Sequence, residues 1–498
     1  MVYKTSADPF RKYSGSEVFD RIRTFETIGE MWENSVKEYG SLNAIETESS
    51  CHTFSELDGD VRHFRPLLEG LAGERIGILV PNSYDFAKVF IASSTAGCTA
   101  MILPPHLPKE AVYGISMQYG LKAVIYASAY SDKVSLLSNV RLIGAEDCSE
   151  EESEAVVSKG DDDAVIMFTG GTTGKSKGAL LSHRAVMQGV ANGCYGTGDV
   201  FNQRYILVLP LFHVFGLIRN LLTSLQTGSD IFICSSNKDL FRDIAVFRPT
   251  YLVAVPALAE MALTLSRKFG RNMLGPDMKY IICGSAPVPP YLVSEYRKLG
   301  ITLCPGYGLT ESANLVSGNP DPFSKPDSIG LPYPGQELRF EDGELWLKGR
   351  NIMKGYVGTD EESFHDGWFR TGDLVRMDDD GFLYITGRIK EIIILSNGEN
   401  ISPAEVEAKF NALSEIQDSQ VFEDVDEGGR HFLALEVVPR MTELTDIAPE
   451  SIEAYLRTKL EAVNDSLPEH QRVSRITIRT SDFERTPSMK IIRYRKCR

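Results

Sequence analysis

The hydrophobic and polar positions along the chain divide it into short elements of two kinds. Residues 28–39 space their apolar side chains as one face of a helix does, and residues 85–96 also follow a helical pattern. Short apolar runs bounded by turn residues indicate buried strands instead. In chain order, these predicted strands are residues 76–80, 99–103, 121–126, 164–168, 205–209, 231–234, 251–255 and 279–283.

Helical segments separate most of these strands, and this alternation predicts an α/β fold of parallel sheets with helices on both faces. The pattern changes near residue 328, and residues 344–349, 355–357 and 367–370 indicate a small antiparallel β unit. After Arg388 the chain predicts a compact α+β domain. Its predicted elements are a strand at 392–395, a helix at 402–413, strands at 419–422 and 431–438, a helix at 450–466 and a strand at 473–479.

Length and composition agree with a globular protein of more than one domain. The chain has 498 residues, of which 43% are hydrophobic and 24% are charged, and a single compact core does not grow to that length. The formal net charge of −16 argues against general nucleic-acid binding, which requires a basic surface. An anionic ligand is still compatible with that charge, because it needs only a local positive potential.

Cysteine usage and the apolar runs predict a cytoplasmic protein without a transmembrane segment. The eight cysteines are scattered and form no C-x-x-C pair, which favours reduced thiols over a metal or redox site. The first ten residues lack the apolar core of a signal peptide. The most apolar run, residues 89–103, is short for a membrane span and favours a buried helix and strand.

The segment at residues 165–178 carries the clearest candidate chemistry. It joins a strand pattern to a loop of glycines, threonines and lysines, and a helix is predicted to start near Ser182. Glycines allow the loop to turn its N–H groups toward one point, while the hydroxyl groups and Lys177 add donors and positive charge. These features favour a polyphosphate site over an ordinary flexible turn. The Walker A pattern is excluded, because Thr169 occupies the position of its first glycine.

Further segments combine residues that suit binding or catalysis. Residues 210–216 hold His213 among apolar neighbours, a setting in which a histidine is usually a core residue. Residues 306–312 read Gly-Tyr-Gly-Leu-Thr-Glu-Ser, and Glu311 offers the carboxylate oxygen that Mg²⁺ prefers beside phosphates. The other segments of this kind are residues 282–287, 368–374, 387–391, 396–407 and 486–491.

In this order, the segments resemble the motifs of the adenylate-forming superfamily, which contains acyl-CoA and aryl-CoA synthetases, beetle luciferases and the adenylation domains of nonribosomal peptide synthetases. The resemblance covers about residues 20–495 and is strongest to AMP-forming acyl-CoA synthetases. The chain departs from the usual motifs at Gly170, Ser176, Pro305 and Met489. The resemblance implies a large N-terminal domain at residues 1–389 and a mobile C-terminal lid domain at residues 390–498.

The resemblance also implies a site for ATP and Mg²⁺. Tyr307 would stack on adenine, Asp373 would accept both ribose hydroxyl protons, and Arg388 would contact the ribose. Glu311 and Thr172 would hold Mg²⁺. The implied cofactor-binding residues are Thr169, Gly170, Gly171, Thr172, Thr173, Gly174, Lys177, Gly284, Ser285, Ala286, Gly306, Tyr307, Gly308, Asp373, Arg388, Lys390 and Gly398.

The implied reaction is the ATP-dependent activation of a carboxylic acid to acyl-AMP and pyrophosphate, followed by transfer of the acyl group to a thiol. Lys490 would stabilise the charge that develops during adenylation. The lid would then rotate about Lys390, and Gly398 would leave room for a pantetheine arm. The implied catalytic residues are Lys490, Thr310, Glu311 and His213.

The sequence leaves three functions open. The first is a carboxylate–CoA ligase, and the similarity of the C-terminal motifs to fatty-acyl synthetases favours a fatty acid over an aryl acid. The second is a stand-alone adenylation enzyme that loads an acyl or aryl acid onto the phosphopantetheine of an acyl carrier protein. The third is an inactive nucleotide-binding regulatory protein, against which Glu311 and Lys490 both argue. An α-amino acid is a poor substrate candidate, because Phe212 is followed by His213 and no nearby aspartate would balance an ammonium group.

Overall fold

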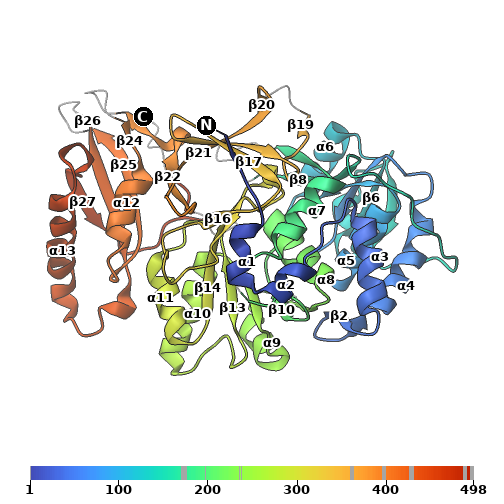
Figure 1. Ribbon diagram of the computed structural model, residues 1–498, viewed down its shortest axis with the longest axis horizontal. Coiled ribbons are helices and arrows are strands. Elements are labelled where there is room, and N and C mark those ends of the chain that lie inside the picture. Colours follow the sequence, from blue (N-terminus) through green and yellow to red (C-terminus); the bar gives the residue numbers. More distant parts are fainter. Residues whose placement is uncertain are drawn as a thin grey trace.

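A computed structural model describes residues 2–169, 177–196, 198–234, 236, 238–358, 364–394, 400–425, 431–485 and 491–493. Figure 1 shows the sheets of the larger part with their helices at the centre and right, and a smaller α+β unit at the left. The α/β class predicted from the sequence is confirmed. Within the described residues, no helix is both long enough and apolar enough to cross a membrane.

The first sheet contains the candidate phosphate loop. Its seven strands follow the order β19 (Gly355–Val357), β9 (Gly178–Ser182), β8 (Asp163–Phe168), β5 (Thr99–Ile102), β4 (Arg75–Leu79), β6 (Ala123–Tyr126) and β7 (Arg141–Gly144). The strands from β8 to β7 run parallel, as the alternation of elements predicted. β9 lies antiparallel beside β8, so the two strands form a hairpin that the sequence pattern did not predict. The helix predicted to start near Ser182 follows β9 at residues 183–192.

The second sheet places two of the predicted site segments side by side. Its nine strands follow the order β16 (Leu331–Pro332), β15 (Ser317–Gly318), β14 (Thr302–Tyr307), β13 (Tyr280–Cys283), β12 (Tyr251–Ala254), β10 (Arg204–Leu207), β11 (Asp230–Ile233), β2 (Asn43–Glu46) and β3 (Cys51–Thr53). The strands from β14 to β2 run parallel. The carboxyl ends of β13 and β14 are therefore neighbours at one edge of the sheet.

Helices pack on both sheets and join them through one apolar core. The largest core cluster combines side chains of both sheets with those of the helices at residues 28–39, 84–95 and 183–192. Several helices start at a Ser or Thr whose side chain accepts a backbone N–H, as Thr27, Thr53 and Ser83 do. The described α-helices are α1 (Asp8–Ser14), α2 (Ser16–Arg21), α3 (Ile28–Tyr39), α4 (Phe54–Phe64), α5 (Tyr84–Thr95), α6 (Lys109–Tyr119), α7 (His183–Asn192), α8 (Thr223–Gln226), α9 (Leu240–Phe247), α10 (Pro256–Phe269), α11 (Pro290–Lys298), α12 (Pro403–Asn411) and α13 (Ile452–Ser466).

A third, antiparallel sheet corresponds to the predicted small β unit. It consists of β1 (Val2–Lys4), β17 (Gln336–Glu341), β18 (Glu344–Gly349), β21 (Trp368–Met377) and β20 (Phe364–His365), with β22 (Leu383–Arg388) beside β21. The N-terminal β1 was not predicted, and it pairs with β17 more than 300 residues along the chain. The prediction that residues 355–357 belong to this unit is wrong, because β19 pairs with β9 and extends the first sheet.

The C-terminal part forms a separate α+β unit with its own core. The strands β25 (Ile416–Val425), β26 (His431–Pro439) and β27 (Arg475–Ile478) pack against α12 and α13 around one apolar cluster. A short pair, β23 (Ile393–Ile394) and β24 (Asn400–Ile401), precedes them. Arg440 anchors this unit to the larger part, since its Nε donates to Glu260 of α10 at 2.9 Å and its guanidinium lies 3.9 Å from the ring of Tyr291 in α11. The domain boundary at residues 389 and 390 stays a prediction.

The helix after the candidate loop is fixed at its start by Ser182 and His183. The Ser182 hydroxyl caps α7 by accepting a backbone N–H of the first turn. His183 is 1% exposed, and its Nδ1 accepts a hydrogen bond from the backbone N–H of Ile28 at 3.3 Å. Burial lowers the pKa of His183 to about 4, although Asp162 and Asp163 act in the opposite direction.

The stability of the protein is expected to depend on pH through His183. An exposed histidine binds a proton near pH 6.5 and the buried one only near pH 4, so between these values the unfolded state holds more protons. The contribution of His183 is complete above this window and falls by roughly 3 kcal/mol as the pH drops through it. Unfolding free energies of the wild type and His183→Gln at pH 7 and pH 4.5 measure the effect. A difference between the two proteins that stays constant over this range would contradict a buried neutral imidazole.

Candidate active site

The candidate site begins where the neighbouring parallel strands β13 and β14 end. Gly284 and Ser285 follow β13, and Gly306 and Tyr307 complete β14. The two backbones lie so close that a Cβ on Gly284 would be 2.9 Å from the Gly306 carbonyl oxygen. Ser285 has a left-handed φ of 67°, which is uncommon for a residue with a side chain. Ligands of open α/β sheets bind outside the carboxyl ends of the strands, so this edge is the natural place for a ligand.

A tight turn after β14 carries the predicted Thr310 and Glu311. Both lie in η4 (Thr310–Ser312), a single turn of 3₁₀ helix. A Cβ on Gly308 would lie 1.1 Å from the Asn314 carbonyl oxygen, so only glycine fits at this position. Asn314 and the residue before it have left-handed φ values of 75° and 49°. Such strained backbone is typical of functional sites, and here it fixes the turn that presents Glu311.

The structure connects Glu311 with the end of the candidate phosphate loop through Tyr356. The Tyr356 hydroxyl donates to Oε1 of Glu311 at 2.6 Å, and the Nζ of Lys177 lies 4.9 Å from the centre of the Tyr356 ring. Tyr356 is held beside the loop because β19 pairs with β9 in the register Tyr356 to Ala179. A carboxylate and an ammonium group that the sequence separates by more than 130 residues therefore share one aromatic neighbour.

Thr169 and Lys177 close the hairpin at the base of the loop. The backbone N–H of Thr169 donates to the carbonyl oxygen of Lys177 at 2.9 Å. The loop itself, residues 170–176, lies outside the described residues. The predicted site residues in that segment are Gly170, Gly171, Thr172, Thr173 and Gly174.

The donor set at Glu311 fits a magnesium ion that is held mainly by substrate phosphates. Within the described residues, no group of three His, Cys, Asp or Glu side chains could hold a metal ion alone. Mg²⁺ characteristically binds one or two carboxylates, several water molecules and phosphate oxygens. Tyr356 engages only Oε1 of Glu311, so the remaining carboxylate oxygen is suited to this role. Thr172, the second predicted ligand, lies outside the described residues.

Asp373 joins Tyr307 and Arg388 in a buried cluster. Its Oδ2 accepts a hydrogen bond from the Tyr307 hydroxyl at 2.5 Å, and its Oδ1 accepts one from Nε of Arg388 at 2.5 Å. Asp373 is 1% exposed. Burial and the Asp373 carboxylate together raise the pKa of Tyr307 well above its ordinary value, so the phenol remains a donor. Burial opposes the charge of Arg388, but Asp373 outweighs it and raises the pKa of the guanidinium.

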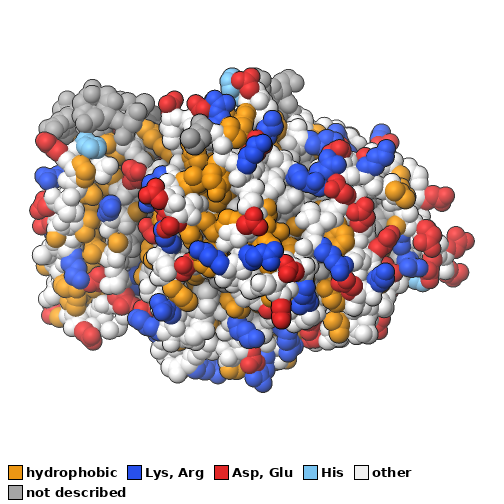
Figure 2. All heavy atoms as spheres, viewed as in Figure 1, with side chains coloured by type: hydrophobic (Ala, Val, Ile, Leu, Met, Phe, Trp, Pro, Cys, Tyr) orange, Lys and Arg blue, Asp and Glu red, His pale blue; other side chains and the backbone are white. Residues whose placement is uncertain are grey.

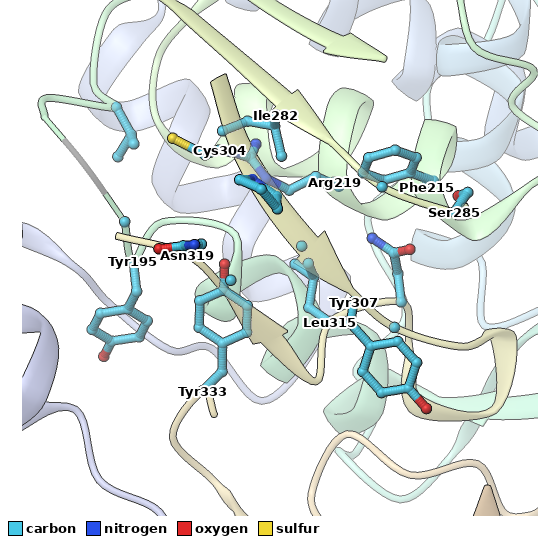
Figure 3. A pocket seen from close by; sticks show the side chains of 18 of the residues that line it. Tyr195, Phe215, Arg219, Ile282, Ser285, Cys304, Tyr307, Leu315, Asn319 and Tyr333 are labelled. Carbon is cyan, nitrogen blue, oxygen red and sulfur yellow. The ribbon is translucent and has the colours of Figure 1, made fainter. Parts of the chain in front are cut away.

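A pocket lies at the carboxyl ends of β13 and β14 (Figure 3). Gly284, Ser285, Gly306, Tyr307 and Gly308 line it, and the structure thus brings these five predicted residues together. The pocket continues along η3 (Phe215–Leu222), a π-helix that directly follows the predicted His213 motif. Other residues that line it include Tyr195, Phe215, Arg219, Ile282, Asn314 and Tyr333.

His213 and Ala286 lie next to these segments. The His213 ring is 4.6 Å from the Phe212 ring, and its carbonyl oxygen accepts the N–H of Leu217 as η3 begins. Ala286 follows Ser285 in the loop after β13 and is half-buried. Ala286 thus lies just beyond β13, and His213 lies two residues before Phe215, which lines the pocket. The catalytic role of His213 stays a prediction.

The predicted hinge leads from Arg388 into the C-terminal unit. Lys390 is exposed in η5 (Ile389–Glu391), immediately after β22. Arg493 lies three residues beyond the predicted catalytic Lys490, and it connects the chain end to the hinge through an ion pair with Glu391 at 3.2 Å. It also forms two hydrogen bonds with Glu407 of α12, at 2.7 and 2.6 Å. Lys490 and Gly398 lie outside the described residues.

Three residues of the site did not emerge from the sequence. Tyr356 lies in a three-residue strand, and nothing local marks it as a neighbour of Glu311. Asn314 has no motif of its own, and its importance follows from the turn at Gly308. Arg219 did leave a signal, because it is a single charge inside the apolar sequence Phe-Gly-Leu-Ile-Arg-Asn-Leu-Leu that follows the His213 motif.

Comparison with known proteins identifies relatives over most of the chain. A feruloyl-CoA synthase from an Amycolatopsis species is 28% identical over 445 residues, with 84% of this chain and 89% of the relative covered. A 2-succinylbenzoate–CoA ligase from Bacillus velezensis is 31% identical over 413 residues, with 77% of this chain and 82% of the relative covered.

A solved structure shares the fold. The O-succinylbenzoate coenzyme A synthetase of Bacillus subtilis, in complex with ATP and magnesium ion, has a TM-score of 0.76 at 24% identity, over 93% of this chain and 98% of that chain. A model of AMP-binding enzymes matches residues 32–357, and a model of the AMP-binding enzyme C-terminal domain matches residues 390–497. The resemblance to adenylate-forming enzymes predicted from the motifs is confirmed, and the chain belongs to the AMP-binding enzyme family.

Proposed function

We propose that the chain is an AMP-forming acid–thiol ligase that activates a carboxylic acid with ATP and transfers it to CoA. Its family and its similarity to CoA synthases and ligases support this function. The observation that carries the proposal is the arrangement around β14. Glu311 follows β14 and is linked through Tyr356 to Lys177, where the phosphates of ATP would bind. Asp373 is hydrogen-bonded to Tyr307 at the end of the same strand, where the ribose would bind.

In the first half-reaction, a carboxylate oxygen of the acid attacks the α-phosphorus of ATP, and pyrophosphate leaves. Lys177 and the loop before it bind the phosphates, and Glu311 with Thr172 holds Mg²⁺, which supplies charge neutralisation when bound. Thr310 donates to the α-phosphate region. Lys490 stabilises the negative charge that develops on the carboxylate and α-phosphate oxygens, an interaction that is stronger in the transition state than in the ground state.

The nucleoside is positioned by the remaining residues of the site. Asp373 has one oxygen engaged by Tyr307 and the other by Arg388, and each oxygen keeps a further lone pair for a ribose hydroxyl. Tyr307 stacks on adenine, with Gly284, Ser285 and Ala286 following the neighbouring strand. Gly306 and Gly308 allow the backbone to approach the ligand closely.

In the second half-reaction, a thiolate attacks the carbonyl carbon of acyl-AMP, the carbon–oxygen bond to the phosphate breaks, and AMP leaves. Rotation of the C-terminal domain about Lys390 withdraws Lys490 and brings the segment of Gly398 to the site. CoA is the acceptor that the named relatives favour. An acyl carrier protein is the alternative acceptor, because its phosphopantetheine offers the same thiol.

The protein is proposed to work in the cytoplasm without a nucleic-acid partner. No disulfide joins the cysteines within the described part of the chain, in agreement with reduced thiols. On the face shown in Figure 2, lysine and arginine side chains are interspersed with aspartate and glutamate. This pattern differs from the continuous basic surface of a general nucleic-acid-binding protein.

ATP–pyrophosphate exchange with a panel of carboxylic acids tests the function directly. An acid-dependent exchange supports adenylation, and its complete absence would favour an inactive nucleotide-binding protein. Product analysis after addition of CoA or of a holo-carrier protein then identifies the acceptor. Thioester formation with the carrier alone would replace CoA by the carrier in the proposal.

Replacement of Lys490 by alanine is expected to separate the two half-reactions. Lys490→Ala should slow acyl-AMP formation by on the order of 10² to 10³, the usual effect of removing one electrostatic stabiliser of a transition state. Thioester formation from preformed acyl-AMP should change little. Rapid-quench measurements of both steps check this, with the exposed Lys409→Ala of α12 as a control in the same domain. Equal losses in the two steps would exclude a role confined to adenylation.

Asp373→Asn is expected to raise the apparent KM for ATP about tenfold or more. The amide is nearly isosteric but lacks the charge, and a hydrogen bond to a charged group contributes about 1.5–3 kcal/mol. Steady-state kinetics with saturating acid measure the change. Glu344→Gln is the matched control, because Glu344 is also a buried carboxylate of the antiparallel sheet and pairs with Arg370 at 2.8 Å. If both variants raise KM equally, the effect reflects the lost buried charge and the ribose role of Asp373 is wrong.

A further inference from the structure

Arg219 is a buried charge for which the described residues provide no counter-charge. It lies on η3, is 3% exposed, and its Nη1 is buried without a hydrogen-bond partner. Burial opposes the charge of Arg219, but the phenols of Tyr205, Tyr333 and Tyr251, with a hydrogen bond to Tyr205, outweigh it and raise the pKa of the guanidinium. Burial raises the pKa of Tyr333 to about 12 and that of Tyr251 well above its ordinary value, so these phenols are uncharged at neutral pH. A desolvated guanidinium without an anion is costly to keep in a folded protein.

This guanidinium belongs to the pocket at the ends of β13 and β14. Arg219 lines that pocket, and Figure 3 shows it among Phe215, Ile282 and Cys304. The same pocket is lined by Ser285, which follows β13. A molecule bound there can therefore supply what the protein does not, an anionic group for Arg219.

A second donor in the same pocket also lacks a partner. Asn314 is 7% exposed, and its Nδ2 is buried without a hydrogen-bond acceptor. Asn319 lines the pocket as well, but its Nδ2 donates to the carbonyl oxygens of Lys325 and Ser328 at 2.7 and 3.0 Å. Asn314 and Arg219 thus each have a donor without an acceptor, whereas Asn319 in the same pocket is satisfied.

A purely hydrocarbon acid would fit the apolar part of this pocket and leave its donors unsatisfied. Phe215, Ile282 and Leu315 would pack against such a chain. The chain would also displace any water that solvates Arg219, and the full cost of an unpaired buried charge would then oppose binding. A site built to bind a polar group strongly rejects an analogue that lacks this group. An apolar site rejects an analogue with an extra polar group much less strongly.

We propose that the acid substrate carries a second carboxylate, so that the pocket selects dicarboxylic acids. The distal carboxylate pairs with the planar fork of Arg219, and Asn314 donates to an oxygen of the same substrate. The first carboxylate is the one that reacts with ATP. This inference rests on the proposed function and specifies its substrate class, which the sequence motifs had directed toward fatty acids.

Pairs of acids with equal carbon number test the inference in the pyrophosphate exchange assay. Suitable pairs are butanoate and succinate, hexanoate and adipate, octanoate and suberate, and benzoate and terephthalate. For the pair that fits best, kcat/KM of the dicarboxylic acid should exceed that of the monocarboxylic acid by on the order of 10²-fold, the effect of completing a buried charge pair. Arg219→Met should bring this ratio close to one, because methionine preserves much of the volume without the charge.

Arg204→Met serves as the matched control. Arg204 belongs to β10 and has a side chain that is 42% exposed, with Nε 3.8 Å from Asp230. The same substitution there should leave the dicarboxylate-to-monocarboxylate ratio unchanged. A change of the ratio in both variants would overturn the assignment to Arg219.

Thermal unfolding separates a binding role from a structural one. If Arg219 has no counter-charge in the free enzyme, Arg219→Met should unfold at the same temperature as the wild type or at a higher one. A clear fall in the unfolding temperature would identify Arg219 as a structural residue and overturn the inference. Monocarboxylic acids that equal or exceed their partners in every pair would also overturn it while leaving the proposed function intact. If no acid supports exchange, the proposed function fails and the inference fails with it.

Discussion

The buried carboxylate of Asp373 connects the parts of the molecule that must act together. It accepts hydrogen bonds from Tyr307, the last residue of β14 in the nine-stranded sheet, and from Arg388, the last residue of β22 in the antiparallel sheet. A carboxylate that is 1% exposed requires such partners, because an unpaired buried charge is strongly unfavourable. Arg388 is also the last residue before the turn that leads to the C-terminal unit. The buried charge of Asp373 therefore holds the end of β14, where the nucleotide is proposed to bind, close to the residue that precedes the predicted hinge.

The local pattern of hydrophobic and polar residues was sufficient to predict the helices and strands that bury one continuous apolar run or one apolar face. The helix predicted at residues 28–39 agrees with α3, and the predicted central strands lie within one or two residues of the observed ones. Two strands that the pattern missed, β1 and β9, depend on the partners that they pair with. β1 has only three residues and pairs with β17, and β9 pairs with the preceding β8. Short segments carry too little periodicity to reveal such pairings.

The site could be predicted to the extent that its chemistry is concentrated in contiguous motifs. Glu311, Tyr307 and Asp373 each lie in a motif with a recognisable composition, and the structure places them around the end of one strand. The link from Glu311 to Lys177 could not be predicted, because it passes through Tyr356 in a different segment. The strain at Asn314 was equally hidden, since it arises from the close approach of its backbone to Gly308. What the sequence lacks is the spatial relation between segments, and that relation decides which side chains share a hydrogen bond.

Arg219 illustrates how a cost in stability can indicate selectivity. The residues of the chemical steps are paired with one another in the described structure, as Asp373 is with Arg388 and Glu311 is with Tyr356. Arg219 has a buried nitrogen that is satisfied by none of the described residues, although it is the least exposed of the described lysines and arginines. Folding alone gives no reason to retain a buried charge that lacks a counter-charge, since an apolar side chain of similar volume would pack at lower cost. A ligand that brings the counter-charge makes the buried arginine favourable for binding. Arg219 is already desolvated in the folded protein, so ligand binding does not require the free energy of desolvating it. The same desolvated donor then disfavours every acid that lacks an anionic group at that position. The groups that activate the acid, such as Asp373 and Glu311, are therefore held in place by other residues of the protein. Arg219, which is proposed to select the acid, obtains its counter-charge only from the substrate.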